Sequence, residues 1–248
     1  MQPLFNFHGN AVLSSLLFLG AAAAGLGVIA LVAFFWYTKR AVWARRTLVV
    51  GVAGGVTYVA LLLGASLGSR EQVVAPGNEK YFCEVDCHQA IGVTAVERAQ
   101  TLGPAGMEAS AQGEFVVVTL RVWFDPETIS RRRPLDIPLN PDPKSIAIVD
   151  ASGRHYRPSS EGQLALEAVS GAQPSLVEPI KPGQSYTTRI VLDLPPDVLR
   201  PRLLIAETAP ETRLLIGHEN SFLHAKTVFR LPEPAPPSTQ SSLGLEVR

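Results

Sequence analysis

Acidic residues are missing from the first 70 positions of this 248-residue chain, and no charge of either sign precedes Lys39. The charged residues up to Ser69 are all basic: Lys39, Arg40, Arg45 and Arg46. Because the chain holds 22 basic and 22 acidic residues in total, residues 1–69 carry +4 and the remainder carries −4. The neutral total therefore combines two unlike parts. The second part is mildly acidic and has no basic stripe, which argues against binding to nucleic acid.

Cysteine and methionine are also rare, with two of each in the chain. No serine sits in a Gly-x-Ser-x-Gly elbow, and no glycine-rich phosphate loop occurs. No two histidines have the i, i+4 spacing that places two zinc ligands on one helical face. We therefore expect no enzymatic activity and no cofactor, with copper as the one alternative that the cysteines leave open.

What the first part does contain is two long runs without a charge, at residues 11–37 and 47–69. Each is long enough to cross a bilayer as a helix, which takes about 20 residues. A cleaved signal peptide is the alternative for the first run, but it would need a basic start and an apolar run of only about 7–15 residues. We predict transmembrane helices over both runs, preceded by a short extracytoplasmic segment at residues 1–10.

The four basic residues all fall between these runs, in residues 38–46. By the positive-inside rule this loop is cytoplasmic, so the N-terminal segment and everything after Ser69 lie outside. Trp36, Tyr37 and Trp43 flank the loop at the depth that aromatic rings prefer. We predict a two-pass protein of the cell (inner) membrane, with its C-terminal domain on the periplasmic or extracellular side. Neither run holds an ionisable residue, which argues against an ion pathway within this chain.

Small residues recur four apart in both runs: Gly20 with Ala24, Ala23 with Gly27, and Gly51 with Gly55. This spacing lets helices approach closely, either within a hairpin or against the helices of a partner subunit. The alternative is the general abundance of alanine and glycine in apolar spans.

After a linker at residues 70–79, residues 80–231 are rich in β-branched and alternating segments punctuated by proline and glycine. The strands predicted there are Lys80–Val96, Glu114–Phe124, Ser145–Asp150, Arg154–Arg157, Gln184–Leu194, Leu203–Glu207, Arg213–Ile216 and Lys226–Leu231. Only Glu161–Ala168 has a helical pattern. Seven or eight short strands predict one β-sandwich or barrel domain. The Pro- and Ser-rich residues 232–248 are predicted to be a disordered tail.

Three segments of this region, 113–124, 147–158 and 181–198, resemble the uncharacterised extracellular immunoglobulin-like domains of bacterial lipoproteins and membrane-anchored proteins. The matching positions are Asp150, Gly153, Tyr156, Pro182, Gly183, Val191, Asp193 and Pro195, with Leu194 in place of the usual small apolar residue. The resemblance implies an immunoglobulin-like sandwich and no catalytic residues. The predicted fold is thus two transmembrane α-helices plus an all-β immunoglobulin-like sandwich. The helical hairpin and the lack of a lipid-attachment cysteine at the start depart from the lipoprotein members.

The two cysteines, Cys83 and Cys87, lie outside the cytoplasm in this topology, where disulfides persist. In one regular strand they would share a face about 13 Å apart, whereas a disulfide needs Cα atoms within about 7 Å. A bridge would therefore require a turn or bulge between them. Three alternatives stay open: a local disulfide, two free thiols or an intermolecular bridge, and a copper site with a third ligand from His88, His155, His218 or His224.

The overall topology also resembles subunit II of the haem-copper oxidases, in which two N-terminal spans precede an outward β-domain with a Cys-x-x-x-Cys dicopper loop. Here the pair opens the domain, whereas in that family it lies near the C-terminus with a glutamate midway and a histidine and a methionine further on. Glu84 directly follows Cys83, and the methionines are Met1 and Met107. No ligand of that family is therefore carried over to a residue of this chain.

Two other polar features are expected to lie on the surface. His218 and His224 are six residues apart near a predicted strand-to-strand turn, where exposed histidines are common. Arg131–Arg133 is the one basic cluster of the second part, and a solvated loop is favoured there over contact with anionic lipid head groups or an acidic partner.

These observations predict a membrane-anchored extracytoplasmic immunoglobulin-like interaction protein, a non-catalytic accessory subunit of a larger membrane complex. Its expected partners are the membrane and other membrane-protein subunits. The alternatives are a copper or redox module associated with electron transport, and an isolated adhesin-like or sensing domain.

Overall fold

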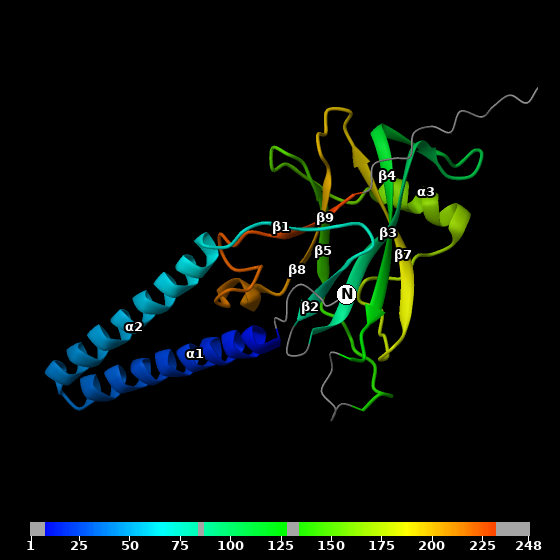
Figure 1. The fold of residues 1–248 in the computed structure, drawn as a ribbon. Helices are drawn as coiled ribbons and strands as arrows, with labels where there is room; N and C mark the ends of the chain where they lie inside the picture. Colours follow the sequence, from blue (N-terminus) through cyan, green and yellow to red (C-terminus); the bar gives the residue numbers. More distant parts are fainter. Residues whose placement is uncertain (1–7, 84–86, 128–133, 232–248) are drawn as a thin grey trace, which may run out of the picture.

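The computed structural model describes residues 8–83, 87–127 and 134–231, apart from the side chains of residues 8–12, 83, 87 and 88. The described chain forms a helical hairpin that projects from one end of a sheet-rich domain, called the β-domain below (Figure 1). The hairpin consists of α1, His8–Tyr37, and α2, Ala41–Leu67. Both helices are long and apolar enough to cross a membrane.

The break between the helices is shorter than the nine-residue loop that the sequence predicts. Only residues 38–40 interrupt the helices, and Lys39 takes a left-handed backbone conformation with a φ of 57°. Arg45 and Arg46 therefore lie in the first turns of α2. The apolar run begins at Thr47, but good helix formers such as Ala44 and Arg45 extend the helix backwards.

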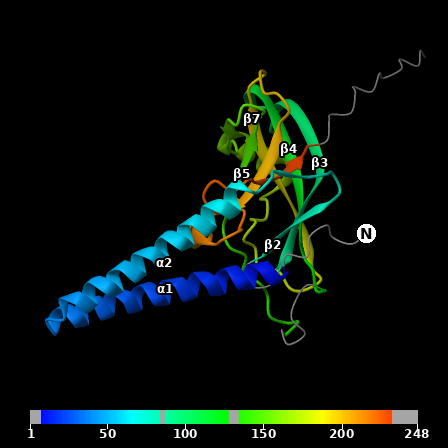
Figure 2. The ribbon, with the colours of Figure 1, turned by 60° about the vertical axis from the view of Figure 1, so that its left-hand side comes forward.

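The helices meet along a seam with the spacing of a coiled coil. The partly buried residues of α1 include Ala21, Val28, Val32 and Phe35, which recur at intervals of three, four or seven. On α2, Gly51 faces this seam, where a Cβ atom would come within 2.5 Å of Val28 Cγ1. A 3-4 spacing gives antiparallel neighbours a shallow crossing angle, in agreement with the near-parallel axes in Figures 1 and 2.

The β-domain contains two sheets. The five-stranded sheet has the order β1-β9-β8-β5-β6, and the four-stranded sheet has the order β2-β3-β4-β7. The strands of the first sheet are β1 (Gln72–Val74), β5 (Lys144–Val149), β6 (His155–Tyr156), β8 (Arg202–Glu207) and β9 (Thr227–Arg230). Those of the second are β2 (Glu79–Cys83), β3 (Cys87–Leu102), β4 (Ala109–Phe124) and β7 (Ser185–Leu194). Neighbours are antiparallel except β1 and β9, which pair in parallel.

The main core lies between the sheets, as in a sandwich. Val116, Val118 and Leu120 of β4 pack in one cluster with Ile148 and Ile205 of the other sheet. The intervening residues of β4 point to the opposite face, where the helix α3 (Ser160–Ser170) covers them. Residues 115–118 of β4 are consequently all buried, with no polar face.

Helix α3 confirms the helical pattern over residues 161–168. Ser159 caps it by accepting a hydrogen bond from Gly162 N at 3.1 Å, and Leu166 is 5% exposed against the sheet. Gly162 allows the close approach, because a Cβ atom there would come within 2.9 Å of the Phe115 ring. The first turn of α3 can therefore lie directly on β4.

Three predicted elements differ in the structure. The predicted strand Lys80–Val96 is two strands, β2 and β3, which pair as an antiparallel hairpin. Arg213–Ile216 is not a strand. A 3₁₀ helix spans Pro210–Leu214 instead, with the proline at its first position. The predicted linker at 70–79 contains β1, an edge strand of the five-stranded sheet. Residues 232–248, predicted as a tail, lie outside the described residues.

Candidate functional site

The connection between β8 and β9, residues 208–226, joins the hairpin to the β-domain, and we call it the junction loop. It lies beside the ends of both helices that face the β-domain in Figures 1 and 2. Ser14 of α1 donates a hydrogen bond to Ile216 O at 2.8 Å, and Tyr58 of α2 donates one to Leu214 O at 2.7 Å. Ser69, just after α2, accepts one from Ala225 N at 2.8 Å. The loop is thus fixed to both helices by long-range contacts.

A buried ion pair holds the same loop to the β-domain. Lys80 of β2 is 6% exposed, and its Nζ lies 2.6 Å from Glu219 Oε1 of the junction loop. The ammonium also donates to Ile205 O at 2.7 Å and lies 4.7 Å from the centre of the Phe82 ring. A buried ammonium with this many partners is well compensated, and it links the two sheets to the loop.

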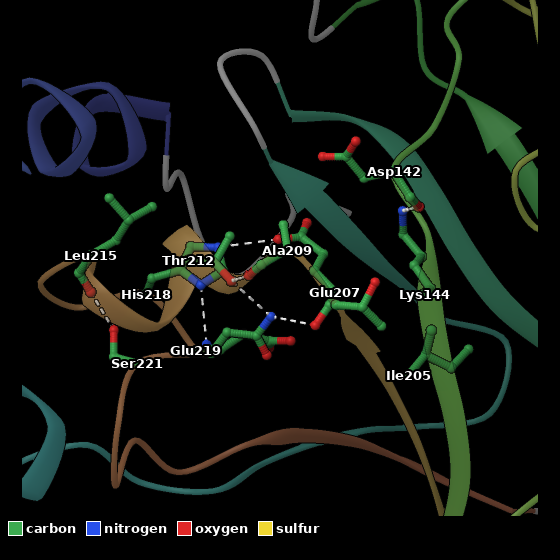
Figure 3. Close-up of polar contacts among 12 residues, drawn as sticks. Asp142, Lys144, Ile205, Glu207, Ala209, Thr212, Leu215, His218, Glu219 and Ser221 are labelled. Carbon is green, nitrogen blue, oxygen red and sulfur yellow. Dashed lines mark hydrogen bonds and ion pairs between the residues drawn. The ribbon is translucent and has the colours of Figure 1, made fainter. Parts of the chain in front are cut away.

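Further polar contacts organise the first half of the loop (Figure 3). Asn220 Nδ2 donates to Glu207 O at 2.7 Å and to Thr212 Oγ1 at 3.2 Å, while Asn220 N donates to His218 Nδ1. His218 Nε2 lies 3.4 Å from Glu207 Oε2. His218 was expected on the surface, but its side chain is only 16% exposed. These contacts replace regular secondary structure and give the loop a defined shape.

Lys226 continues this polar cluster at the end of the loop. Its Nζ donates to Glu219 O, and burial lowers its pKa, an effect that the Glu219 charge opposes. The charged groups at positions 80, 219 and 226 are therefore gathered inside the junction, whereas Glu211 and Arg213 of the loop are exposed.

Asp150 organises the turn on which the family resemblance rests. Its carboxylate is 2% exposed and accepts hydrogen bonds from Ser152 Oγ at 2.6 Å, Arg154 Nε at 2.7 Å and Tyr156 Oη at 3.2 Å. Gly153 supplies the left-handed backbone of the turn, with a φ of 80°. The aspartate, glycine and tyrosine of the motif therefore form one structural unit between β5 and β6.

The hydrogen bonds from Ser152 and Arg154 hold the pKa of Asp150 well below its usual range. A carboxylate with a lowered folded-state pKa stabilises the fold above its unfolded pKa of about 4, and this stabilisation disappears as the pH falls below that value. We expect Asp150→Asn to be less stable than wild type at pH 7, with a difference that shrinks below about pH 4. Urea unfolding of both proteins between pH 7 and pH 3 measures this. A pH-independent difference would contradict the assignment.

The backbones of Cys83 and Cys87 are cross-strand partners at the end of the β2–β3 hairpin. Opposed residues of an antiparallel pair have Cα atoms about 4.5–5.5 Å apart, which is within disulfide range. The separation of about 13 Å applies to one regular strand, and the structure has two paired strands there, with a register shift at Phe82/Cys83. The side chains of Cys83, Cys87 and His88 lie outside the described part, so disulfide, free thiols and copper stay predictions.

Among the described residues, no group of three histidine, cysteine, aspartate or glutamate side chains is close enough to hold a metal ion. His155 lies exposed in β6, and His224 Nδ1 contacts Ala225 O. The basic cluster Arg131–Arg133 lies outside the described residues.

The small residues of the hairpin separate into two groups. Gly51 is used within the hairpin, against Val28. A Cβ atom at Gly20, Gly27 or Gly55 would meet nothing within 4 Å, and Ala24 is exposed. The predicted Gly51–Gly55 pair is therefore divided, with Gly51 at the seam and Gly55 outside it.

No protein-family model matches the chain, and no curated protein matches it. Three solved bacterial structures share weak similarity. MPT63, a secreted protein from Mycobacterium tuberculosis, is 12% identical with a TM-score of 0.41, covering 66% of this chain and 99% of that chain. The yjhA protein from Bacillus subtilis is 14% identical with a TM-score of 0.39, covering 64% and 99%. A conserved hypothetical protein from Bacillus anthracis is 14% identical with a TM-score of 0.37, covering 53% and 87%.

Sequence reasoning did not find the residues that build the junction. Lys80 and Glu219 are 139 positions apart, and Tyr58 and Leu214 are 156 apart. The one local signal is that Lys80 directly precedes the aromatic residues Tyr81 and Phe82 in a strand, since lysine is seldom buried without a partner.

Proposed function

We propose that this protein is a two-pass membrane protein whose helical hairpin anchors an immunoglobulin-like β-domain outside the cytoplasm, as a non-catalytic accessory subunit of a larger membrane complex. The observation that carries the proposal is the apolar surface of the hairpin. Residues such as Leu26, Val50 and Val56 are 63–70% exposed around both helices, outside the seam. In water this surface would be very unfavourable, whereas lipid or partner helices would cover it.

The orientation follows from the basic residues at the bend. Lys39, Arg40, Arg45 and Arg46 lie at the end of the hairpin remote from the β-domain (Figure 1). With these residues on the cytoplasmic side, the β-domain is placed outside. The immunoglobulin-like assignment is supported by a core between two sheets and by the Asp150 turn, which holds three of the residues that carry the family resemblance.

A role within a complex is favoured over simple tethering by the unused small residues. One span would be enough to attach a domain to a membrane, yet the chain has two, fixed to one another and to the β-domain. The outward positions at Gly20, Gly27 and Gly55 leave room for another helix to approach closely.

We expect affinity purification of the full chain from gently solubilised membranes to recover a companion membrane protein. Gly55→Leu should reduce its yield about fivefold, because a close helix contact in a membrane contributes about 1 kcal/mol. Val56→Leu, also exposed on α2, is the matched control and should leave the yield unchanged. Quantitative mass spectrometry of the eluates gives the ratio. A clean monomer in wild type would contradict the accessory role.

A copper or redox module is the second candidate, favoured by the cross-strand pairing of Cys83 and Cys87. Two thiolates at adjacent strand positions could bind a soft metal such as copper, with a third ligand. Thiol counting together with metal analysis of the purified protein tests it. Bound copper that is lost in Cys83→Ser would favour this function, whereas two oxidised cysteines without metal would exclude it.

A further inference from the structure

The outer side of the junction loop carries three apolar side chains that nothing in the β-domain covers. Leu214, Phe222 and Leu223 are 41%, 49% and 71% exposed, respectively. They flank the positions at which the loop contacts the helices, since Leu214 O accepts the Tyr58 hydrogen bond. We call these three residues the loop tip.

The loop tip lies beside the helices and not beyond their ends. Tyr58 is nine residues before the end of α2 at Leu67, which is about 14 Å along the helix axis. Ser14, which contacts the same loop, is six residues inside α1, about 9 Å from His8. The hydrocarbon core is about 30 Å thick and α2 is about 40 Å long, so a core centred on α2 ends about 5 Å before Leu67 and includes the position of Tyr58.

One face of α2 is covered at the end of the helix near the β-domain. Leu62 and Ser66 follow Tyr58 at one-turn intervals and are 4% and 1% exposed. These positions are closed off at the end of the hairpin where the junction loop packs. The loop therefore continues the apolar outer surface of the hairpin, and the loop tip belongs to that surface.

Two of the four charged side chains of the loop point away from the tip, whereas Glu211 and Arg213 are exposed. Glu219 pairs with Lys80 and Lys226 donates to Glu219 O, so both point back into the junction. Arg213 is exposed next to Leu214, and its long side chain can keep the guanidinium at headgroup depth. Leu223 has a left-handed φ of 62°, which is unfavourable for leucine. Its side chain points away from the core and is 71% exposed.

We propose that the loop tip inserts among the acyl chains of the outer leaflet, beside the hairpin, as a third membrane contact that fixes the orientation of the β-domain. The inference rests on the proposed function in one respect, namely that the helices cross the membrane. The inference adds that the β-domain itself binds lipid and does not rotate about residues 70–71.

Lipid-dependent quenching of single added tryptophans in the full chain, reconstituted in phosphatidylcholine vesicles, tests the proposal. Leu223→Trp reports on the tip and Val56→Trp on the hairpin. Leu164→Trp is the matched control, because Leu164 is 68% exposed on α3, away from the hairpin. The native tryptophans contribute the same background to each variant. Phe222→Trp gives a conservative second probe of the tip if Leu223→Trp does not fold.

We expect acyl-brominated lipid to quench the added emission at positions 223 and 56 but not at 164, and iodide in the buffer to quench only position 164. Iodide quenching at positions 223 and 222, with position 56 still quenched by lipid, would overturn the inference and leave the anchor intact. Protection of the tip from both quenchers would indicate a protein contact and would also overturn it. Failure of lipid quenching at position 56 would overturn the proposed membrane span.

Discussion

Glu219→Ala is expected to lower the free energy of unfolding of the β-domain by about 3 kcal/mol, because it leaves the Lys80 ammonium buried without its counter-ion. The loss falls at the low end for a broken buried pair, since Ile205 O still accepts from the ammonium at 2.7 Å. Urea unfolding of the full chain in detergent, followed by near-ultraviolet circular dichroism, measures it.

Glu114→Ala is the matched control for this experiment. The Arg98–Glu114 pair has the same 2.6 Å separation, but its side chains are 30% and 32% exposed. Solvent screening limits such a pair to about 1 kcal/mol or less. Equal losses in Glu219→Ala and Glu114→Ala would show that the burial of Lys80 has no energetic consequence. The double variant Lys80→Met/Glu219→Leu removes both charges and should recover part of the loss.

In Glu219→Ala, the junction loop should lose more order than the sheets. Since Glu219 and Lys226 fix the second half of the loop, its loss of order in Glu219→Ala would also release the contacts to Ser14 and Tyr58. Increased amide hydrogen exchange in residues 213–226 would report this directly. The ion pair thus connects the stability of the β-domain to its position on the hairpin.

Leu166→Ala is expected to cost about 2–5 kcal/mol, the range for deleting a buried leucine side chain. Leu166 is 5% exposed in the cluster that joins α3 to Phe115, Val117 and Val191. Because β4 buries both of its faces here, a cavity under α3 cannot be filled without moving the four-stranded sheet.

Leu164→Ala on the same helix is the control, since Leu164 is 68% exposed and its removal creates no cavity. Its effect should stay within about 0.5 kcal/mol. Thermal or urea unfolding of the two variants gives the comparison. Similar midpoints for both would mean that α3 is not packed on β4 as the structure has it.

Elements with a strong local signal could be predicted from the sequence. Two charge-free runs predict α1 and α2, and the polar pattern predicts α3 between residues 161 and 168. Strands such as β4, β5, β7 and β8 were also predicted within a few residues, except that β4 begins earlier, at Ala109. In each case the pattern is set by neighbours in the chain, which is what hydrophobic periodicity measures.

The β2–β3 reversal could not be predicted in this way. Residues 84–86 are Glu-Val-Asp, without the glycine, asparagine or proline that marks most turns, and the alternation continues across them. The incorrect strand at Arg213–Ile216 has a related origin. Short apolar runs do not distinguish a strand from a loop that packs against another part of the molecule.

Composition and periodicity along the chain were enough to predict the two apolar helices, the basic charge between them and the β-rich character of residues 80–231. The pairing of β1 with β9, the backbone pairing of Cys83 with Cys87, and the hydrogen bonds from both helices to residues 208–226 became known only from the folded arrangement. Local preference acts through neighbouring residues, whereas Lys80 and Glu219 are 139 positions apart and meet only in the folded chain.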